Sequence, residues 1–323
     1  WQGVDGIVRT RDASQRQLEQ TLRLNTVLAQ WQTDLAAVQD TGAVPPLIFD
    51  GATLRLTRGT PEGVQVVAWD GRSAQGWGQL ADGAWAIINL AGENLSAGRW
   101  TAARKTAISE SRQQAAQAVI EAISQAAVKP KVLVQASAVG YYGPRGDEKI
   151  NENEKAGSTF DATTCVAWEK ATDAVEALGV RRVIIRTGVV IEKGGGALAR
   201  MALPFKFFIG GPVGSGKQYF PWIHLTDEIN AIQFLLENTQ QKGVFNLSAP
   251  NPVTMKEFAG ALGKAMGRPS FMPVPGFALQ ILFGEMASIL LNGQRVMPNR
   301  LLQQGFKFKY ATVDAALAAI YQA

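Results

Sequence analysis

Short continuous runs of apolar residues alternate with longer amphipathic stretches over most of the chain. A short apolar run predicts a strand that is buried on both faces. Runs of this kind lie at residues 85–90, 131–136, 180–187 and 243–248. Helical apolar spacing marks residues 101–127, 161–178, 227–237 and 254–266. Thr254 and Glu257 match a capping box at the start of the last helix. Strands that alternate with helices of this length predict an α/β fold with a mostly parallel sheet.

The N-terminal part of the chain follows a different pattern. Residues 12–40 are polar with a narrow apolar stripe at helical spacing, which predicts one long helix. An Asp-Gly pair then separates alternating runs at residues 47–50 and 53–58, which predicts a β-hairpin. A third strand is expected at residues 64–69. Because residue 1 is Trp, we expect the chain to begin inside a longer reading frame or after processing.

Composition narrows the chemistry. The 323 residues include 33 Gly, one Cys and one His, which excludes an internal disulfide and a Cys- or His-rich metal site. We therefore expect no metal. The net charge is only +5, and the Lys and Arg residues are spread along the chain, so we expect no nucleic-acid partner. The most apolar stretch, residues 277–291, is shorter than the roughly 20 residues of a membrane span and predicts an amphipathic helix.

Two glycine motifs match the spacing of phosphate-binding loops. Gly140, Gly143 and Gly146 have the spacing G-x-x-G-x-x-G, but polar residues follow them rather than the helix that should bind pyrophosphate. Residues 211–217 match a P-loop, but Gln218 stands where Ser or Thr should bind Mg²⁺. We expect neither motif to hold a nucleotide phosphate.

Small or polar residues follow two of the predicted strands. Residues 89–92 (NLAG) end the first strand with small side chains, which would let a ligand approach the backbone. Ser137 follows the second strand and precedes Tyr141 and Tyr142, whose hydroxyl groups could polarise a carbonyl. Each motif also has a structural explanation, namely a plain turn for the first and a turn cap with core packing for the second.

Cys165, Trp168 and Glu169 share one predicted helix, in which Cys165 and Glu169 lie on the same face. A buried thiol beside a core Trp is the favoured interpretation. His224 precedes another predicted helix, for which Thr226 or Asp227 is the expected N-cap. A structural role in that loop is favoured over a role as a catalytic base.

Several of these segments occur together in one order. They are residues 89–100, 136–143, 165–169, 186–190, 210–224, 249–253 and 293–308. Together they resemble the epimerase-family branch of the atypical short-chain dehydrogenase/reductases, over about residues 64–321. That branch contains NAD(P)-binding, sugar-nucleotide-epimerase-like proteins with a small C-terminal domain.

The resemblance implies a Rossmann-like core at residues 64–250 and a smaller substrate-side domain at 251–323, with inserts from 190–225. It implies NADP or NAD as cofactor and a cytoplasmic oxidoreductase or epimerase that acts on a small molecule such as a sugar nucleotide. The implied cofactor residues are Asn89, Leu90, Ala91, Gly92, Arg186 and Thr187. The implied substrate residues are Gly216, Gln218, Trp222 and His224.

Two features depart from the wider superfamily. None of the five Tyr residues is followed by Lys four positions later, so the usual Tyr-x-x-x-Lys base is missing. The corresponding helix reads Cys165-x-x-x-Glu169, which is also this branch's own pattern. We therefore take Ser137, Tyr141 and Tyr142 as the catalytic candidates.

The second departure is that the first strand, glycine loop and helix of the family are missing or replaced. Residues 1–63 resemble instead a minor pseudopilin of type II secretion, which predicts a fusion and a much reduced dinucleotide affinity. Two alternatives therefore stay open. One is a structural pseudopilin-like component at the inner membrane or in the periplasm, and the other is a catalytically dead, ligand-binding α/β domain.

Overall fold

A computed structural model describes residues 47–49, 54–56, 67–193 and 196–322. The helix predicted at residues 12–40 lies outside these residues. Residues 46–323 make up one compact unit.

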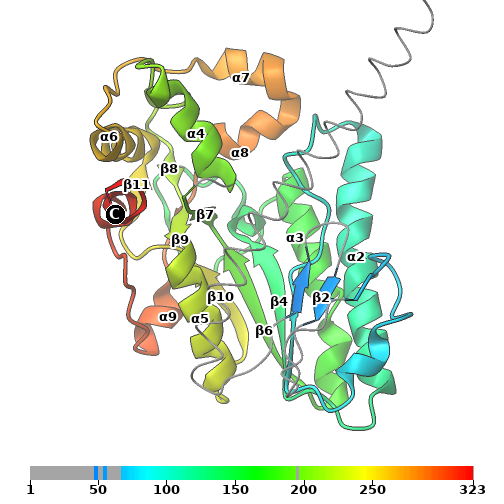
Figure 1. Cartoon of the computed structure of the whole chain (residues 1–323). Coiled ribbons are helices and arrows are strands. Elements are labelled where there is room, and N and C mark those ends of the chain that lie inside the picture. The colour runs from blue at the N-terminus through cyan, green and yellow to red at the C-terminus, as the bar shows by residue number, and fades with distance from the viewer. Residues whose placement is uncertain (1–46, 50–53, 57–66, 194–195, 323) are drawn as a thin grey trace, which may run out of the picture. The chain divides into compact units, whose positions relative to one another are not determined.

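The centre of this unit is a four-stranded parallel sheet in the order β10-β6-β4-β3 (Figure 1). The strands are β3 Ala86–Asn89, β4 Val132–Ala138, β6 Arg181–Thr187 and β10 Gly243–Leu247. Ile88, Val134, Val183 and Gly243 lie opposite one another across the sheet. The predicted α/β fold and its four buried strands are confirmed, because continuous apolar runs suit strands covered on both faces.

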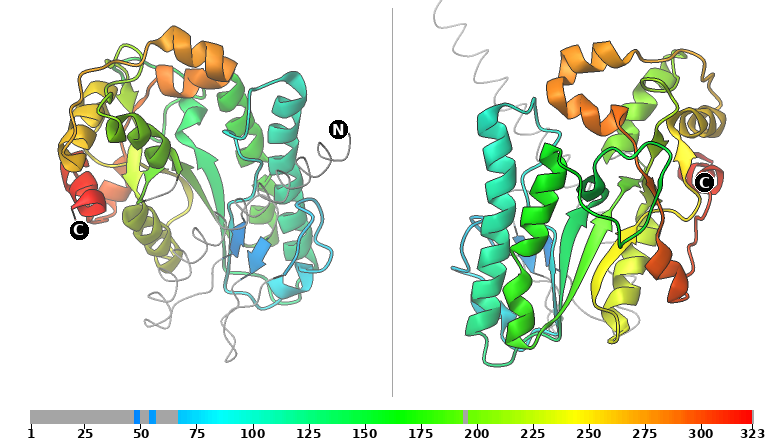
Figure 2. Two further views of the ribbon diagram at one scale, coloured as in Figure 1. Left: turned by 45° about the horizontal axis from the view of Figure 1, so that its top comes forward. Right: turned by 180° about the vertical axis from the view of Figure 1, so that it is seen from behind.

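Helices cover both faces of this sheet (Figures 1 and 2). The helices α2 Ala102–Gln125 and α3 Phe160–Lys170 pack together on one face, and α5 Leu225–Glu237 lies on the other. The helix predicted at residues 161–178 is interrupted. The carbonyl oxygen of Glu169 accepts hydrogen bonds from Thr172 Oγ1 and Arg182 Nη1, and the chain continues as a 3-10 helix over Asp173–Leu178.

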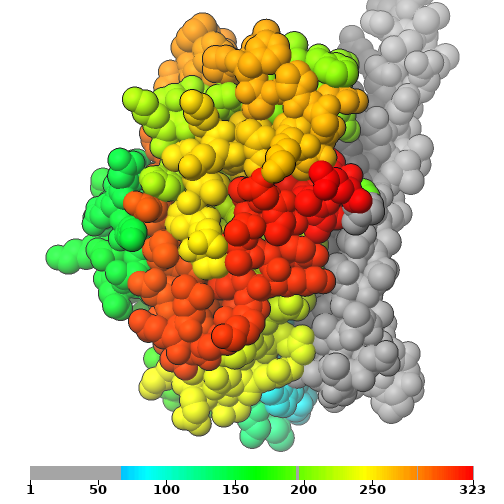
Figure 3. Space-filling model, turned by 90° about the vertical axis from the view of Figure 1, so that its left-hand side faces the viewer, coloured from blue at the N-terminus to red at the C-terminus, as the bar shows by residue number. Residues whose placement is uncertain are grey.

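A second core joins residues near the middle of the chain to its C-terminal part. It is centred on Phe220, Trp222, Phe258, Leu262 and Leu317. Its elements are β7 Val189–Ile191, α4 Gly196–Lys206, β8 Tyr219–Phe220, β9 Trp222–His224, β11 Val253–Thr254, α6 Met255–Met266 and α10 Val313–Tyr321. The surfaces of α6 and α10 lie side by side (Figure 3). The capping box predicted at the start of α6 is confirmed.

The prediction of one continuous helix over residues 277–291 is wrong. It divides into α7 Gly276–Phe283, the 3-10 helix Gly284–Ala287 and α8 Ser288–Leu291. Gly284 has φ +61°, a left-handed conformation that ends α7. None of the described helices is long and apolar enough to cross a membrane. The remaining elements are β5 Lys149–Ile150, which pairs with β12 Arg295–Val296, and α9 Asn299–Gln303.

The predicted hairpin is confirmed as far as it is described. Strands β1 Leu47–Phe49 and β2 Leu54–Leu56 pair antiparallel, with Leu47 opposite Leu56. Strand β1 lies beside β3, although the described residues show no ladder between them. The strand predicted at residues 64–69 is wrong in its described part. Residues 67–69 have no regular structure. Trp69 instead turns inward, packs edge-on against Trp77 and donates its indole N–H to the carbonyl oxygen of Ser73.

Candidate functional site

A pocket of about 180 Å³ lies at the carboxyl ends of β4 and β6. Its lining includes residues 138–140 at the end of β4, residues 187–189 at the end of β6 and residues 288–290 of α8. Helices α2 and α3 contribute Arg112 and Trp168. The carboxyl ends of parallel strands are where this architecture binds ligands. The pocket is therefore the candidate site.

A buried ion pair lies directly beside the pocket. The carboxylate of Glu169 accepts hydrogen bonds from Arg186 Nε and Nη2, both at 2.8 Å, which is a bidentate arrangement. Ser137 Oγ donates to the same carboxylate at 2.6 Å. Burial alone would lower the pKa of Arg186, but its bonds to Glu169 outweigh burial and raise that pKa above its ordinary value. This contact fixes α3 to the ends of β4 and β6.

The two tyrosines surround the same guanidinium group. Arg186 Nη1 donates to the Tyr142 hydroxyl at 3.0 Å, and that hydroxyl donates to Asn246 Oδ1 at 2.6 Å. The Tyr141 ring stacks on the guanidinium at 3.3 Å. Burial raises the pKa of Tyr142 to about 12, so this phenol is a poor base near neutral pH.

The structure thus brings the three catalytic candidates together around Arg186 rather than at the pocket wall. Ser137, Tyr141 and Tyr142 are not among the residues that line the pocket. Arg186, predicted as a cofactor contact, already donates hydrogen bonds to Glu169 and Tyr142. Among the predicted site residues, Thr187 alone lines the pocket.

The predicted cofactor turn at residues 89–92 is held by its own side chains. Asn89 Nδ2 donates to Gln135 Oε1 at 2.9 Å, and Asn89 Oδ1 accepts from the backbone N–H of Ala91 at 3.2 Å. Leu90 follows the strand directly and is half-buried. A Cβ atom on Gly92 would lie 3.0 Å from the Arg112 side chain. The glycine therefore makes room for Arg112.

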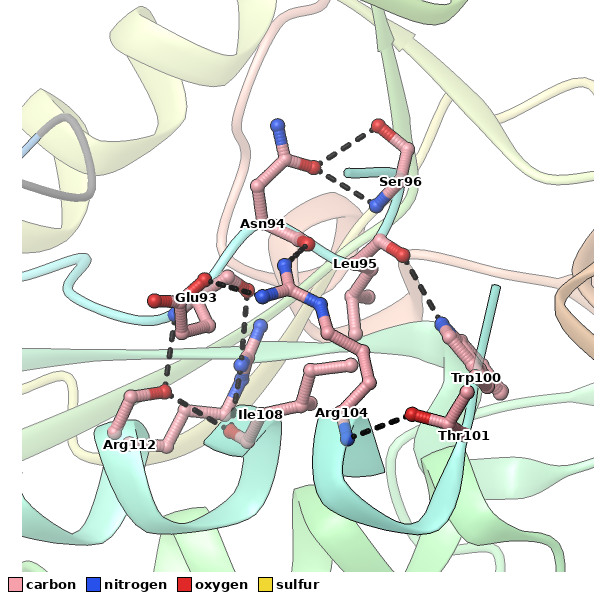
Figure 4. Close-up of polar contacts among 10 residues, drawn as sticks. Glu93, Asn94, Leu95, Ser96, Trp100, Thr101, Arg104, Ile108 and Arg112 are labelled. Carbon is pink, nitrogen blue, oxygen red and sulfur yellow. Dashed lines mark hydrogen bonds and ion pairs between the residues drawn. The ribbon is translucent and has the colours of Figure 1, made fainter. Parts of the chain in front are cut away.

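Arg112 extends from α2 toward this turn (Figure 4). Its Nη1 donates to the carbonyl oxygens of Ile108 at 2.8 Å and Glu93 at 3.2 Å. The Glu93 carboxylate pairs instead with Arg104 Nη1 at 2.9 Å. Thr101 caps α2 by accepting from the backbone N–H of Arg104. This local network holds the segment after β3 against the first turns of α2.

The predicted substrate residues do not reach the pocket. Gly216 packs against Lys256, and Trp222 is buried in the second core. Gln218 Nε2 donates to the carbonyl oxygens of Val213 at 2.8 Å and Leu290 at 3.0 Å. Gln218 therefore supports the pocket only indirectly, because Leu290 of α8 lines it.

His224 is the N-cap of α5, which corrects the expected cap at Thr226 or Asp227. Its Nδ1 accepts from the backbone N–H of Thr226 at 3.0 Å. The Asp227 carboxylate is used elsewhere, because it accepts from the backbone N–H groups of Lys309 and Tyr310. Burial lowers the pKa of His224 to about 4, so the ring is neutral near pH 7.

Glu228, which no sequence pattern singled out, is hydrogen-bonded to the predicted site residue Thr187. Thr187 Oγ1 donates to Glu228 Oε1 at 2.8 Å. The Glu228 side chain is buried in α5, and its Oε2 has no hydrogen-bond partner among the residues that the structure describes. Burial raises the pKa of this carboxyl to about 8. The acidic pair Asp227 and Glu228 after His224 was a signal in the sequence, but nothing local distinguished their roles.

Cys165 is not suited to nucleophilic chemistry. Its thiol lines the pocket, but burial, reinforced by Glu169, raises its pKa to about 11. A nucleophilic cysteine needs the opposite shift. Among the described residues, no group of three His, Cys, Asp or Glu side chains could hold a metal ion.

The lining of the pocket is compatible with a flat, mostly apolar ligand. Gly140 and Gly188 bring bare backbone to its wall, and a Cβ on Gly188 would lie 2.8 Å from the Pro221 carbonyl oxygen. Its largely apolar lining suits a flat ring such as nicotinamide. Ahead of β3, however, the sequence has no G-x-x-G-x-x-G loop to bind the pyrophosphate.

Known proteins match most of this chain. Residues 58–248 match the NAD dependent epimerase/dehydratase family, and residues 274–320 match a domain of unknown function, DUF1731. The chloroplastic SDR39U1 homologue of Arabidopsis thaliana, an epimerase family protein, is 45% identical over 248 residues, which is 76% of this chain and 71% of that protein.

Solved structures agree with these sequence matches. The crystal structure of human epimerase family protein SDR39U1 (isoform 2) with NADPH has 37% sequence identity and a TM-score of 0.70, covering 74% of this chain and 82% of that chain. UDP-glucuronic acid 4-epimerase from Bacillus cereus, at 14% identity and a TM-score of 0.61 over 76% of this chain and 74% of that one, shares the fold. The Rossmann-like fold is thereby confirmed, and the pseudopilin resemblance gains no support.

Proposed function

The chain belongs to the NAD-dependent epimerase/dehydratase family, and from this premise we propose that it is an NADP(H)- or NAD(H)-dependent oxidoreductase that acts on a small carbonyl or alcohol compound. The observation that carries the proposal is the pocket at the carboxyl ends of β4 and β6. The NADPH in the human relative's crystal structure supports NADP(H) as the cofactor. A cytoplasmic location remains a prediction.

The residues that would hold the reactive half of the cofactor are those that follow the strands. They are residues 138–140, which begin at the last residue of β4, and residues 187–189, which begin at the last residue of β6. A nicotinamide ring bound there supplies or accepts a hydride. Because no glycine loop precedes β3, we expect a weaker dinucleotide affinity than in relatives that carry this loop.

Thr187 and Glu228 would transfer the proton to and from the substrate oxygen. Thr187 lines the pocket, and its hydroxyl bonds the buried Glu228 carboxyl at 2.8 Å. With a pKa of about 8, Glu228 is largely protonated near pH 7 and can return a proton that Thr187 gives to a substrate oxygen. The reverse transfer serves the oxidation of an alcohol.

Ser137, Tyr141 and Tyr142 would position the site. Their contacts converge on Arg186 and Glu169, which hold the ends of β4 and β6 in place. Loss of one of these side chains should therefore weaken the geometry of the pocket without removing the proton donor.

Titration with NADPH, followed by cofactor fluorescence, tests the proposal. We expect saturable binding with a dissociation constant at or below ~1 mM. Thr187→Val removes the hydroxyl and keeps the backbone of this position, so it should still bind NADPH but lose reduction of any carbonyl compound that the protein reduces. If NADPH does not bind at ~1 mM, the oxidoreductase proposal fails and a ligand-binding domain without catalysis is the better description.

A further inference from the structure

We propose that Arg112 and Trp168 form an anion-binding subsite of the pocket, and that the substrate carries a carboxylate on an otherwise apolar body. The inference rests on the proposed function in one respect, since it takes the end of this pocket that carries Arg112 and Trp168 as the substrate side, beside the strand ends that would hold the nicotinamide.

Arg112 is a buried cation that has no buried counter-ion within the described part of the chain. Its side chain lines the pocket, and the residue is only 7% exposed. It forms no ion pair with a described residue, because the Glu93 carboxylate is paired with Arg104. Its hydrogen bonds to described residues leave from Nη1 and end on two carbonyl oxygens. A buried charge is costly unless an opposite charge meets it, so the pocket is the natural place for an anion.

Trp168 provides a second donor at the same place. The Arg112 guanidinium lies over the Trp168 ring, 4.8 Å from its centroid. The indole Nε1–H is buried and has no hydrogen-bond partner among the described residues. Trp168 is 7% exposed and lines the same pocket. A buried donor that lacks a partner is unfavourable, and an acceptor on the ligand would satisfy it.

The rest of the lining is mainly apolar. Its larger members are Leu95, Phe160, Val189, Phe220, Ile289 and Leu290. A hydroxylated sugar ring would lose its water contacts against these side chains. The acidic residue of the lining, Asp161, precedes Trp168 by seven residues on α3, about 10 Å along the helix. The cationic end of the pocket is therefore separate from this carboxylate. One guanidinium with one N–H matches a carboxylate ligand better than a phosphate dianion.

Phenylacetate and its neutral isostere phenylacetamide are suitable probes, with inorganic phosphate as the competing anion. Isothermal titration should show phenylacetate binding to the unchanged protein. In Arg112→Met this binding should fall about tenfold or more, while phenylacetamide binding stays the same. Trp168→Phe, which removes only the N–H, should weaken phenylacetate binding about threefold to tenfold.

Two variants control the interpretation. Lys170→Met removes an exposed cation at the end of α3 that does not line the pocket, so phenylacetate binding should not change. Arg112→Lys keeps the charge and should retain part of the binding, which separates a lost anion contact from a lost fold. Circular dichroism of each variant checks that the fold is intact.

NADPH titrations of the same variants separate this inference from the proposed function. Unchanged NADPH binding in Arg112→Met, together with lost phenylacetate binding, supports the substrate subsite. Equal phenylacetate binding with and without Arg112, preferential binding of phosphate, or loss of NADPH in Arg112→Met would overturn it. If NADPH fails to bind any variant while phenylacetate binding still depends on Arg112, the subsite stands and the oxidoreductase proposal falls.

Discussion

The buried carboxyl of Glu228 should make the stability of this protein fall as the pH rises. Among the described residues, its one hydrogen bond comes from Thr187 and its Oε2 has no partner. Glu228→Gln removes the ionisable group and keeps an oxygen that can accept from Thr187. The variant therefore isolates the cost of ionising this one side chain.

The sign and the size of the effect follow from linkage between protonation and folding. The carboxyl has an ordinary pKa of 4.5, which we take for the unfolded chain, and a pKa of about 8 in the folded protein. Between these values the folded state binds the additional proton, so the free energy of unfolding decreases as the pH rises. At roughly 1.4 kcal/mol per pH unit, the penalty reaches about 5 kcal/mol above pH 8.

Urea unfolding of both proteins at a series of pH values measures this directly. The free energy of unfolding of Glu228→Gln should exceed that of the unchanged protein by less than about 1 kcal/mol at about pH 5 and by about 5 kcal/mol at about pH 9. Glu237→Gln, on the exposed end of the same helix, controls for the loss of one negative charge. A stability difference that stays constant over this pH range would refute a raised pKa at Glu228.

Three further substitutions test the Glu169–Arg186 ion pair, the turn after β3 and the N-cap of α6. Glu169→Ala should destabilise the protein by about 3–5 kcal/mol in urea unfolding, because it leaves the Arg186 guanidinium buried and unpaired. An effect below about 1 kcal/mol would show that the pair behaves as a surface ion pair. Gly92→Ala should displace the Arg112 side chain, 3.0 Å from the added Cβ, and weaken phenylacetate binding in isothermal titration, whereas unchanged binding would show that the guanidinium adjusts without loss. Thr254→Ala removes the capping box of α6 and should cost about 1 kcal/mol in thermal unfolding, with Thr254→Ser restoring most of it.

The sequence alone determined the layout of the core. Strand and helix positions came from the spacing of apolar residues, which is a local property, and the four buried strands were found at their observed places. The order of short motifs identified the family before any contact was known. The errors fell where distant contacts decide local structure, as in the break of α3 after Glu169 and the cap of α5 at His224.

The site itself depended on tertiary structure. Ser137, Glu169 and Arg186 were visible as separate residues, but their contact exists only because β4 and β6 pair and α3 packs across them. Arg112 and Trp168 are 56 positions apart, and no local pattern shows that one lacks a counter-ion and the other a hydrogen-bond acceptor. The apolar pattern specifies which faces are buried because burial follows the period of each element. Which polar groups meet inside depends on how those elements come together, and this is what makes the pocket.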